Sequence, residues 1–347
     1  MISEQGDPAC ASTLRRSQLG GAAGPTIHSK ADGCSAGHPM CWRWQPEVTS
    51  MSRRGLFLSI LAVPGLAMAQ QTLPFHLHDN LVSVQATING KTVSAVLDSG
   101  SGAMIVSKSL ATELGLQLGH SPLQASGGGT GNQSLFPVKL KSVEFGSLAL
   151  HDVPGYAIDL GSISSSSGLE VDALLGYPFF ENHVVRVNYA ESTVSIYPEN
   201  DPPGCPNPIS FELIHNVPVV TATVKSQATS APETVHLVID LGSRNHNYLG
   251  TAFLQSDAGK ALYTNGHKQA VGEGTGGRAM GVVSEFAELS VGTQHFHNVK
   301  FALTEQVKAF NLEQVDGSLG VPLWAGGIIT FNYPKQQICI QAPRKSS

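Results

Sequence analysis

The chain has 347 residues, of which 26 are acidic and 21 basic, and its formal net charge is −5. This acidic balance argues against nucleic acid or an anionic membrane as the partner, because both attract basic surfaces. No Cys/His set has the spacing of a zinc site, so we expect neither a metal nor another cofactor.

The N-terminal part of the chain, before Gln70, differs from the rest. Residues 1–50 are rich in Gly, Ala and Ser and lack periodic apolar spacing, so we expect a non-physiological or disordered extension. Residues 51–69 have a basic start, a short apolar core and a small-x-small end, which predicts a secretory signal peptide. The Arg53-Arg54 pair also resembles a twin-arginine export signal. The alternative is a disordered tail on a cytoplasmic protein.

Export would leave a mature chain over 70–347, whose formal net charge is 15 minus 22, or −7. We expect it in the periplasm or secreted, with no stable membrane anchor after signal cleavage. Only Cys205 and Cys339 remain in this chain. An even number of cysteines in an oxidising compartment is compatible with a disulfide, and two unpaired thiols are an equal alternative.

The remaining sequence predicts mostly β-structure. Alternating apolar residues over 81–88, closed by Asn89-Gly90, predict a hairpin that leads into a strand ending at Asp98. A short helix is expected from Ser107 to Leu114, with Gly115 after it as a stop signal. No regular alternation of strands and helices supports a parallel sheet.

One sequence pattern occurs twice. Asp98 and Asp240 each end an apolar run in the form Asp-x-Gly-Ser, at an offset of 240 minus 98, or 142. The flanking sequence repeats in the same order, for example at Phe75 and Phe211, where the offset is 211 minus 75, or 136. Registers kept over such a long stretch of chain predict two structural copies of one lobe.

The repeat also predicts the boundaries of the two lobes. We expect a first lobe over 70–200, a linker over 201–208 and a second lobe over 209–347. The offset grows between Lys225 and Thr234, where the second copy needs a longer hairpin than Asn89-Gly90. Since one chain supplies both lobes, we expect a monomer.

Two facing carboxylates would have a defined chemistry. At short range the ionisation of both groups costs much free energy, so Asp98 and Asp240 would share a proton. Such a pair can hold a water molecule, take a proton from it with one member and polarise a carbonyl group with the other. Gly100 and Gly242 would allow the main chain to turn sharply beside each carboxylate.

With these motifs in order, the chain resembles the aspartic peptidases, in a bilobal pepsin-like arrangement with short, retroviral-protease-like lobes. The resemblance implies an all-β fold of two homologous six-stranded-type β-barrel lobes with an active-site cleft between them, and Asp98 and Asp240 as the catalytic pair. It also implies a glycine-rich flap in each lobe that closes on the substrate. The predicted flap residues are Gly127, Gly128, Gly129 and Thr130 in the first copy and Gly274, Thr275 and Gly276 in the second.

The resemblance gives roles to the residues beside each aspartate. Ser101 and Ser243 are expected to hydrogen-bond the outer carboxylate oxygens and so support the catalytic turns. Ser99 is expected to reach across to the backbone of the opposite lobe. In the second copy Leu241 stands where the family has Thr or Ser, so one of two reciprocal cross-lobe bonds should be missing.

Two functions follow from this pattern. The first is an exported aspartic endopeptidase that hydrolyses extended polypeptide. The second is a peptide-binding protein of the same architecture, weakened in catalysis by Leu241. Cleft walls are expected at Met104, Ile105 and Val106 and near Tyr248. Residues 272–277 match a dinucleotide fingerprint, but no helix follows a strand there, so we expect no nucleotide site.

Overall fold

The computed structural model describes residues 70–347 except 127, 275–276, 311–313, 342 and 344–347. The predicted N-terminal extension and signal peptide, residues 1–69, lie outside the described residues. Among the described residues, no helix is long and apolar enough to cross a membrane.

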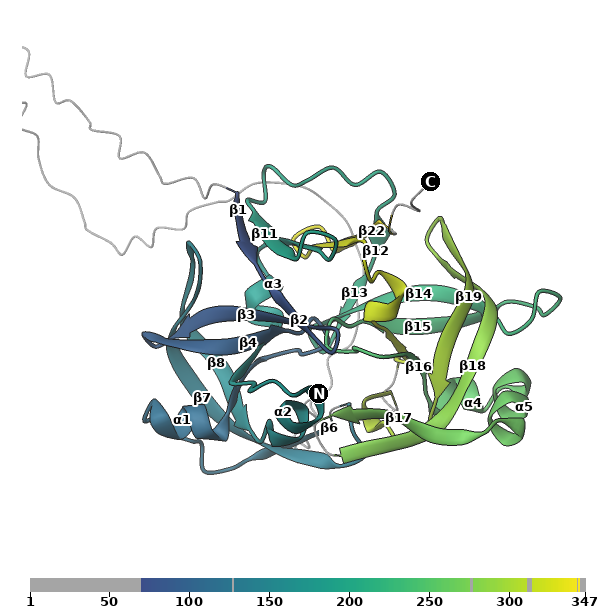
Figure 1. Ribbon diagram of the computed structural model, residues 1–347, viewed down its shortest axis with the longest axis horizontal. Coiled ribbons are helices and arrows are strands. Elements are labelled where there is room, and N and C mark those ends of the chain that lie inside the picture. Colours follow the sequence, from purple (N-terminus) through teal and green to yellow (C-terminus); the bar gives the residue numbers. More distant parts are fainter. Residues whose placement is uncertain (1–69, 127, 275–276, 311–313, 342, 344–347) are drawn as a thin grey trace, which may run out of the picture. The chain divides into compact units, whose positions relative to one another are not determined.

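The first half of the described chain forms an eight-stranded sheet in the order β2-β3-β4-β9-β5-β8-β7-β6, coloured blue to teal in Figure 1. Its strands are β2 (His76–His78), β3 (Leu81–Ile88), β4 (Lys91–Leu97), β5 (Met104–Ser107), β6 (Leu123–Ser126), β7 (Asn132–Phe145), β8 (Leu148–Ile158) and β9 (Ala173–Leu175). Three short helices accompany it: α1 (Lys108–Glu113), α2 (Gly161–Ser167) and α3 (Tyr177–Phe180).

The second half repeats this topology as β13-β14-β15-β20-β16-β19-β18-β17. Its strands are β13 (Glu212–Ile214), β14 (Val217–Lys225), β15 (Glu233–Ile239), β16 (Asn247–Leu249), β17 (Lys268–Gly274), β18 (Gly277–Val291), β19 (Gln294–Leu303) and β20 (Gly317–Leu319). Its helical segments are α4 (Thr251–Leu254), α5 (Asp257–Asn265), η1 (Lys308–Phe310) and η2 (Val321–Leu323). The prediction of an all-β chain built from two homologous lobes is therefore confirmed.

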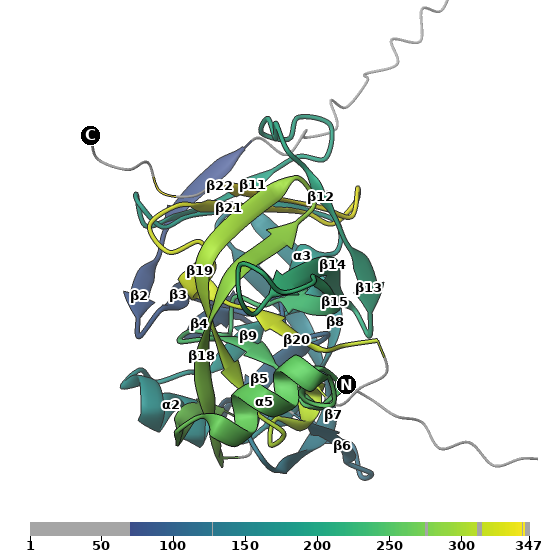
Figure 2. The ribbon, with the colours of Figure 1, turned by 90° about the vertical axis from the view of Figure 1, so that its right-hand side faces the viewer.

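A six-stranded antiparallel sheet joins the two lobes, and its strands lie side by side in Figures 1 and 2. The strands, in sheet order, are β1 (Gln71–Pro74), β11 (Thr193–Tyr197), β10 (Val184–Asn188), β21 (Ile328–Asn332), β22 (Gln337–Gln341) and β12 (Ile209–Ser210). The lobes meet where β10 pairs with β21, with Val185 opposite Phe331. Backbone hydrogen bonds thus continue from one lobe into the other.

Local signals in the sequence explain several turns. Asn89 and Gly90 have φ of 50° and 84°, so both occupy the left-handed region that a two-residue hairpin requires. The corresponding hairpin of the second lobe has a longer connection, residues 226–232, as the growing offset predicts. Helix α1 also agrees with prediction, because the Ser107 hydroxyl accepts a hydrogen bond from Leu110 N at 3.1 Å and Gly115 follows with φ of 62°.

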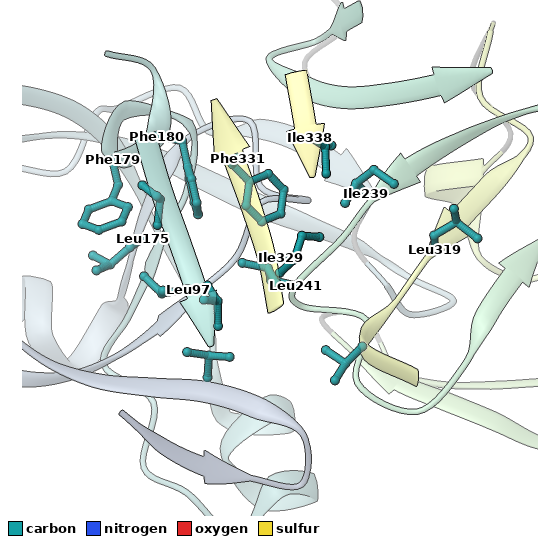
Figure 3. Packing of buried hydrophobic residues seen from close by; sticks show 14 of the residues in the cluster. Leu97, Leu175, Phe179, Phe180, Ile239, Leu241, Leu319, Ile329, Phe331 and Ile338 are labelled. Carbon is teal, nitrogen blue, oxygen red and sulfur yellow. The ribbon is translucent and has the colours of Figure 1, made fainter. Parts of the chain in front are cut away.

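The most extensive apolar cluster runs through both lobes and the shared sheet, and each lobe has a smaller cluster of its own. Figure 3 shows part of this cluster, in which Leu97 and Leu175 of the first lobe and Ile239 and Leu319 of the second lie around strands of the shared sheet. All four side chains are fully buried. Burial on this scale stabilises the strand ends that carry Asp98 and Asp240, because each apolar side chain contributes about 1.5–3 kcal/mol.

Cys205 and Cys339 form a disulfide with a Cα–Cα separation of 5.8 Å, which decides between the two alternatives that the sequence left open. The bond ties the segment between the lobes to β22. It closes a loop of 134 residues, and a loop of this size stabilises the fold by about 2–4 kcal/mol. A stable disulfide indicates an oxidising environment.

Candidate active site

The two aspartates occupy equivalent positions at the ends of buried strands. Asp98 N donates to Leu175 O at 3.2 Å, and Asp240 N donates to Leu319 O at 2.9 Å. These acceptors lie on β9 and β20, which pair in parallel with β4 and β15. The strands β9 and β20 therefore hold the backbone of both aspartates.

The two carboxyl groups point toward each other and lie within hydrogen-bonding distance. A glycine turn at each aspartate makes this approach possible. A methyl group on Gly100 would collide with the Asp240 carboxylate, and one on Gly242 would lie 2.8 Å from Asp98 Oδ1. Each glycine thus faces the aspartate of the opposite lobe, and no larger residue fits without displacing it.

Burial and mutual repulsion control the ionisation of the pair. Burial raises the pKa of Asp98 well above its usual range, and the negative charge of Asp240 raises it further. Burial also raises the pKa of Asp240, although the N–H group of Gly242 opposes this shift. The hydrogen bond between the two side chains raises the pKa of Asp98 further and opposes the rise at Asp240, so the two ionisations belong to the pair.

Backbone N–H groups fix the orientation of each carboxylate. Gly100 N donates to Asp98 Oδ1 at 3.0 Å, and Gly242 N donates to Asp240 Oδ1 at 2.8 Å. The N–H groups of Ser101 and Ser243 also lower the pKa of the aspartate in their own turn. Each lobe therefore stabilises its own carboxylate with two corresponding backbone donors, and the N–H group of Gly100 also lowers the pKa of Asp240 in the opposite lobe.

The hydroxyls of Ser101 and Ser243 differ from the prediction that they bond the outer carboxylate oxygens. Ser101 Oγ donates to Ala103 O at 2.9 Å, and Ser243 Oγ donates to His246 O at 2.8 Å. A hydroxyl has one proton to donate, so neither can also donate to its carboxylate. These side chains close the turns, and the backbone orients the acids.

The cross-lobe contacts are unequal, as Leu241 leads one to expect. Ser99 Oγ donates to Ile239 O at 2.8 Å and accepts from Leu241 N at 3.0 Å, so one buried hydroxyl makes two bonds to the second lobe. The Leu241 side chain is fully buried in the shared apolar core, close to Ile329 in Figure 3. The second copy thus replaces a polar cross-lobe contact with apolar packing.

The predicted flaps are two hairpins, β6–β7 and β17–β18, whose described tip residues approach each other. A methyl group on Gly274 would lie 2.8 Å from Gly128 C, and one on Gly277 would lie 3.4 Å from Thr130 Oγ1. Gly129 is buried at the first tip. The predicted flap residues Gly127, Thr275 and Gly276 lie outside the described residues.

A cavity of about 350 Å³ lies between the lobes and contains both carboxyl groups, with Gly128 and Gly274 at its rim. Its apolar wall comes mainly from the first lobe. The aliphatic lining residues of that lobe are Leu81, Val96, Ile105, Leu135, Ile158, Ile163 and Leu174.

The predicted cleft wall at Met104, Ile105 and Val106 is right only for Ile105. Met104 and Val106 are fully buried in the core, because alternate residues of a strand point to opposite faces. Tyr248 packs against apolar residues of the second lobe, and its hydroxyl donates to Val271 O at 2.6 Å. Burial raises the pKa of Tyr248 to about 12.

Arg244 lines the cavity as well, and the sequence patterns did not predict it. The available signal was its position in the repeat, because the first copy has Gly102 where the second has this arginine. Residues 272–274 end β17 and Gly277 begins β18, so the described part of this segment opens no helix. Among the described residues, no group of three His, Cys, Asp or Glu side chains could hold a metal ion.

Comparisons with known proteins agree with this geometry. Residues 84–179 match the family model described as aspartyl protease. An aspartic proteinase from Irpex lacteus is similar in structure, with a TM-score of 0.50, 10% identity, and coverage of 78% of this chain and 96% of that one. A retropepsin-like aspartic protease from Rickettsia conorii matches at a TM-score of 0.27 and 20% identity, covering 37% of this chain and 91% of that one. No curated protein matches the chain.

The repeated lobes, the shared sheet and the similarity to the Irpex lacteus enzyme define the fold as that of the bilobal aspartic proteinases. The family match covers the first lobe, including Asp98 and the strand β9 beneath it. Residues 84–179 thus resemble the aspartyl protease family in sequence.

Proposed function

We propose that the protein is an aspartic peptidase that hydrolyses peptide bonds in extended polypeptide, with Asp98 and Asp240 as the catalytic pair. The observation that carries the proposal is the pair itself, two buried carboxyl groups hydrogen-bonded to each other inside an interlobe cavity. Burial and close approach keep one proton on the pair, which is the state that acid-base catalysis at a peptide bond needs.

The reaction follows from that state. The ionised carboxylate takes a proton from a water molecule held between the two groups, while the protonated one donates a hydrogen bond to the peptide carbonyl oxygen. The water oxygen adds to the carbonyl carbon. The pair then returns a proton to the amide nitrogen, the C–N bond breaks, and a carboxylic acid and an amine leave. One water is consumed and the pair regains its original proton count.

The lining of the cavity supports polypeptide as the substrate. The flap hairpins are β-structure at the rim of the cavity, and such edges bind extended peptides through main-chain hydrogen bonds. The aliphatic first-lobe wall offers space for an apolar side chain beside the pair. The remaining predicted flap residues, Gly127, Gly129, Thr130, Thr275 and Gly276, are proposed to close over the bound chain.

A second candidate is a peptide-binding protein with little hydrolysis. The observation that favours it is the unequal cross-lobe contact, in which Ser99 is met by Leu241 and no second hydroxyl is supplied. Loss of one buried hydrogen bond is worth about 1 kcal/mol, which can loosen the geometry of the pair without unfolding the protein.

We also propose that the protein acts outside the cytoplasm as a monomer, after removal of a signal peptide over residues 51–69. The disulfide between Cys205 and Cys339 supports the compartment, because disulfides persist where the environment is oxidising. The proposed lobe boundaries are 70–200 and 209–347, with 201–208 as the linker.

Hydrolysis of an unfolded polypeptide from acid to neutral pH tests the main proposal. The samples are the wild type, Asp98→Asn, Asp240→Asn and, as a matched control, Asp152→Asn, whose carboxylate pairs with Lys139 on the surface. We expect loss of activity in the first two variants and wild-type rates in the control. Persistence in either dyad variant would contradict the pair, and tight peptide binding without cleavage by the wild type would favour the binding protein.

A further inference from the structure

The fourth residue after each aspartate differs between the two lobes. Arg244 occupies this position in the second lobe, and Gly102 occupies it in the first. Their main chains make matching contacts, because Asn80 Nδ2 donates to Arg244 O at 3.0 Å and Asn216 Nδ2 donates to Gly102 O at 3.3 Å. The two positions are therefore equivalent, and only the second has a side chain.

The Arg244 side chain joins three parts of the cleft. Its Nη1 forms an ion pair with Asp79 Oδ2 at 2.6 Å, in the turn between β2 and β3 of the first lobe. Its Nη2 donates to Ser166 Oγ on α2 at 2.8 Å and to Glu273 O on the second flap at 3.5 Å. The side chain is only 11% exposed and lines the cavity. It therefore connects the β2–β3 turn and helix α2 of the first lobe with the second flap.

A second hydrogen bond links α2 to the same flap. Ser162 Oγ, also on α2, donates to Gly274 O at 3.1 Å. Helix α2 of the first lobe therefore binds two neighbouring carbonyl groups of the second flap, one directly and one through Arg244. These carbonyl oxygens already accept protein donors, which leaves them less free to pair with a peptide.

The equivalent end at Gly102 has a different closure. A methyl group on Gly102 would collide with His215 O, so no side chain can extend from this position into the cleft. The first flap is linked to η1 by Lys308 Nζ and Asn132 Oδ1, 3.3 Å apart and exposed to solvent. An exposed contact of this kind opens at little cost.

We propose that Arg244 closes one end of the substrate cleft and so limits how many substrate residues can lie on that side of the cleaved bond. This inference rests on the proposed peptidase function. An extended peptide advances about 3.3 Å per residue, so a chain that continued past Arg244 would have to push the guanidinium away from Asp79 and Ser166. Displacing a guanidinium that is only 11% exposed from its bonds to Asp79, which is 43% exposed, and to Ser166 costs free energy, whereas a peptide that ends before Arg244 avoids this cost.

The consequence is a position-dependent cleavage pattern. Bonds near one terminus of a polypeptide are cut in preference to internal bonds, because only a chain end fits the closed side. This narrows the endopeptidase expected from the sequence to an enzyme with a length limit on one side of the bond.

A peptide series with one cleavable bond tests the inference. The peptides are lengthened by single residues on one side of that bond at a time, and kcat/KM is measured for each. We expect extension past a fixed length on one side to lower kcat/KM about tenfold or more in the wild type, since two or more hydrogen bonds must break. Extension on the other side should have little effect.

Substitution identifies the residue responsible. Arg244→Ala should remove the limit on the short side, and Arg244→Lys, which keeps a charge near Asp79 but not the planar fork, should give an intermediate limit. The matched control is Arg278→Ala, because this arginine pairs with Glu273 on the same flap but is 67% exposed. It should keep the wild-type limit. A wild type without a limit, or an Arg244→Lys protein with the full one, would overturn the inference.

Peptide binding separates this inference from the proposed hydrolysis. The same peptides, labelled with a fluorophore, are titrated against Asp98→Asn and against Asp98→Asn combined with Arg244→Lys. A length limit in binding that weakens with the lysine supports the inference even if the wild type cleaves nothing, in which case only hydrolysis fails. Equal affinity at all lengths would overturn the inference even if hydrolysis is observed.

Discussion

The two lobes share one topology and one catalytic turn, yet they differ at two of the positions that face the opposite lobe. The first lobe has Ser99 and Gly102, where the second has Leu241 and Arg244. The aspartates themselves stay equivalent, because each is held by the same backbone donors and the same parallel strand. The duplicated backbone can therefore keep the pair equal while the side chains around it diverge.

The largest expected effect concerns the glycines that face the opposite aspartate. Gly100→Ala and Gly242→Ala should each displace a carboxylate, because a methyl group at either position lies too close to the opposite acid. A misplaced catalytic group costs on the order of a hundredfold in rate, which a kcat/KM assay detects. Gly204→Ala is the control, since its methyl group would meet no atom within 4 Å. Equal losses of kcat/KM in all three variants would show that contact with the opposite aspartate does not cause the loss.

The disulfide gives the next largest effect, on stability. Cys205→Ser with Cys339→Ser should lower the free energy of unfolding by about 2–4 kcal/mol, because the closed loop spans 134 residues. For lobes of this size the melting temperature should fall by roughly 4–16 °C. Thermal unfolding followed by circular dichroism measures the change, and a reducing agent should reproduce it in the wild type. An unchanged melting temperature would argue against a bond that ties the linker to β22.

Ser99 should matter more than the other two serines of the turns. Ser99→Ala removes two buried cross-lobe hydrogen bonds and should lower the free energy of unfolding by about 2–3 kcal/mol, with a loss of kcat. Ser101→Ala and Ser243→Ala each remove one hydroxyl-carbonyl bond and should cost about 1 kcal/mol. Chemical denaturation of the three variants tests this order. Three equal losses in the free energy of unfolding would show that the Ser99 hydroxyl contributes no more to stability than those of Ser101 and Ser243.

A further prediction is a pH-dependent change in stability at Asp98. Its folded-state pKa is raised, so the unfolded chain ionises first and the folded state loses stability as pH rises from about 4 through the raised pKa. Asp98→Asn removes this loss. The variant should therefore gain melting temperature relative to the wild type as pH rises from acid to neutral. A difference that stays constant with pH would mean that the carboxyl group ionises as it does in water.

The sequence was sufficient for the features that the backbone repeats. Alternating apolar residues, the Asn89-Gly90 turn and the doubled Asp-x-Gly-Ser pattern predicted the hairpins, the two lobes and the facing aspartates, because these depend on local periodicity and on register. The sequence did not show which of several nearby acceptors a side-chain hydroxyl bonds. The hydroxyls of Ser101 and Ser243 bond carbonyl groups in their own turns.

Long-range side-chain contacts were also beyond the sequence. Arg244 bonds residues 165 positions before it and 29 positions after it, a set that only the folded chain brings together. At the predicted cleft wall, the sequence identified the right strand but not which of its faces points into the cavity. Both gaps concern where side chains point once the lobes have met.

Titration of the two carboxyl groups tests whether Asp98 and Asp240 share a proton. Carbon-13 NMR of aspartate-labelled protein, with Asp98→Asn and Asp240→Asn used to assign the signals, follows both groups across the pH range. We expect two separated ionisation steps for the pair, one of them well above the usual range of an aspartate. Replacing Asp240 should lower the raised pKa of Asp98, because it removes the neighbouring charge, and replacing Asp98 should remove that step altogether. Two independent titrations near the usual aspartate pKa would contradict a shared proton between the lobes.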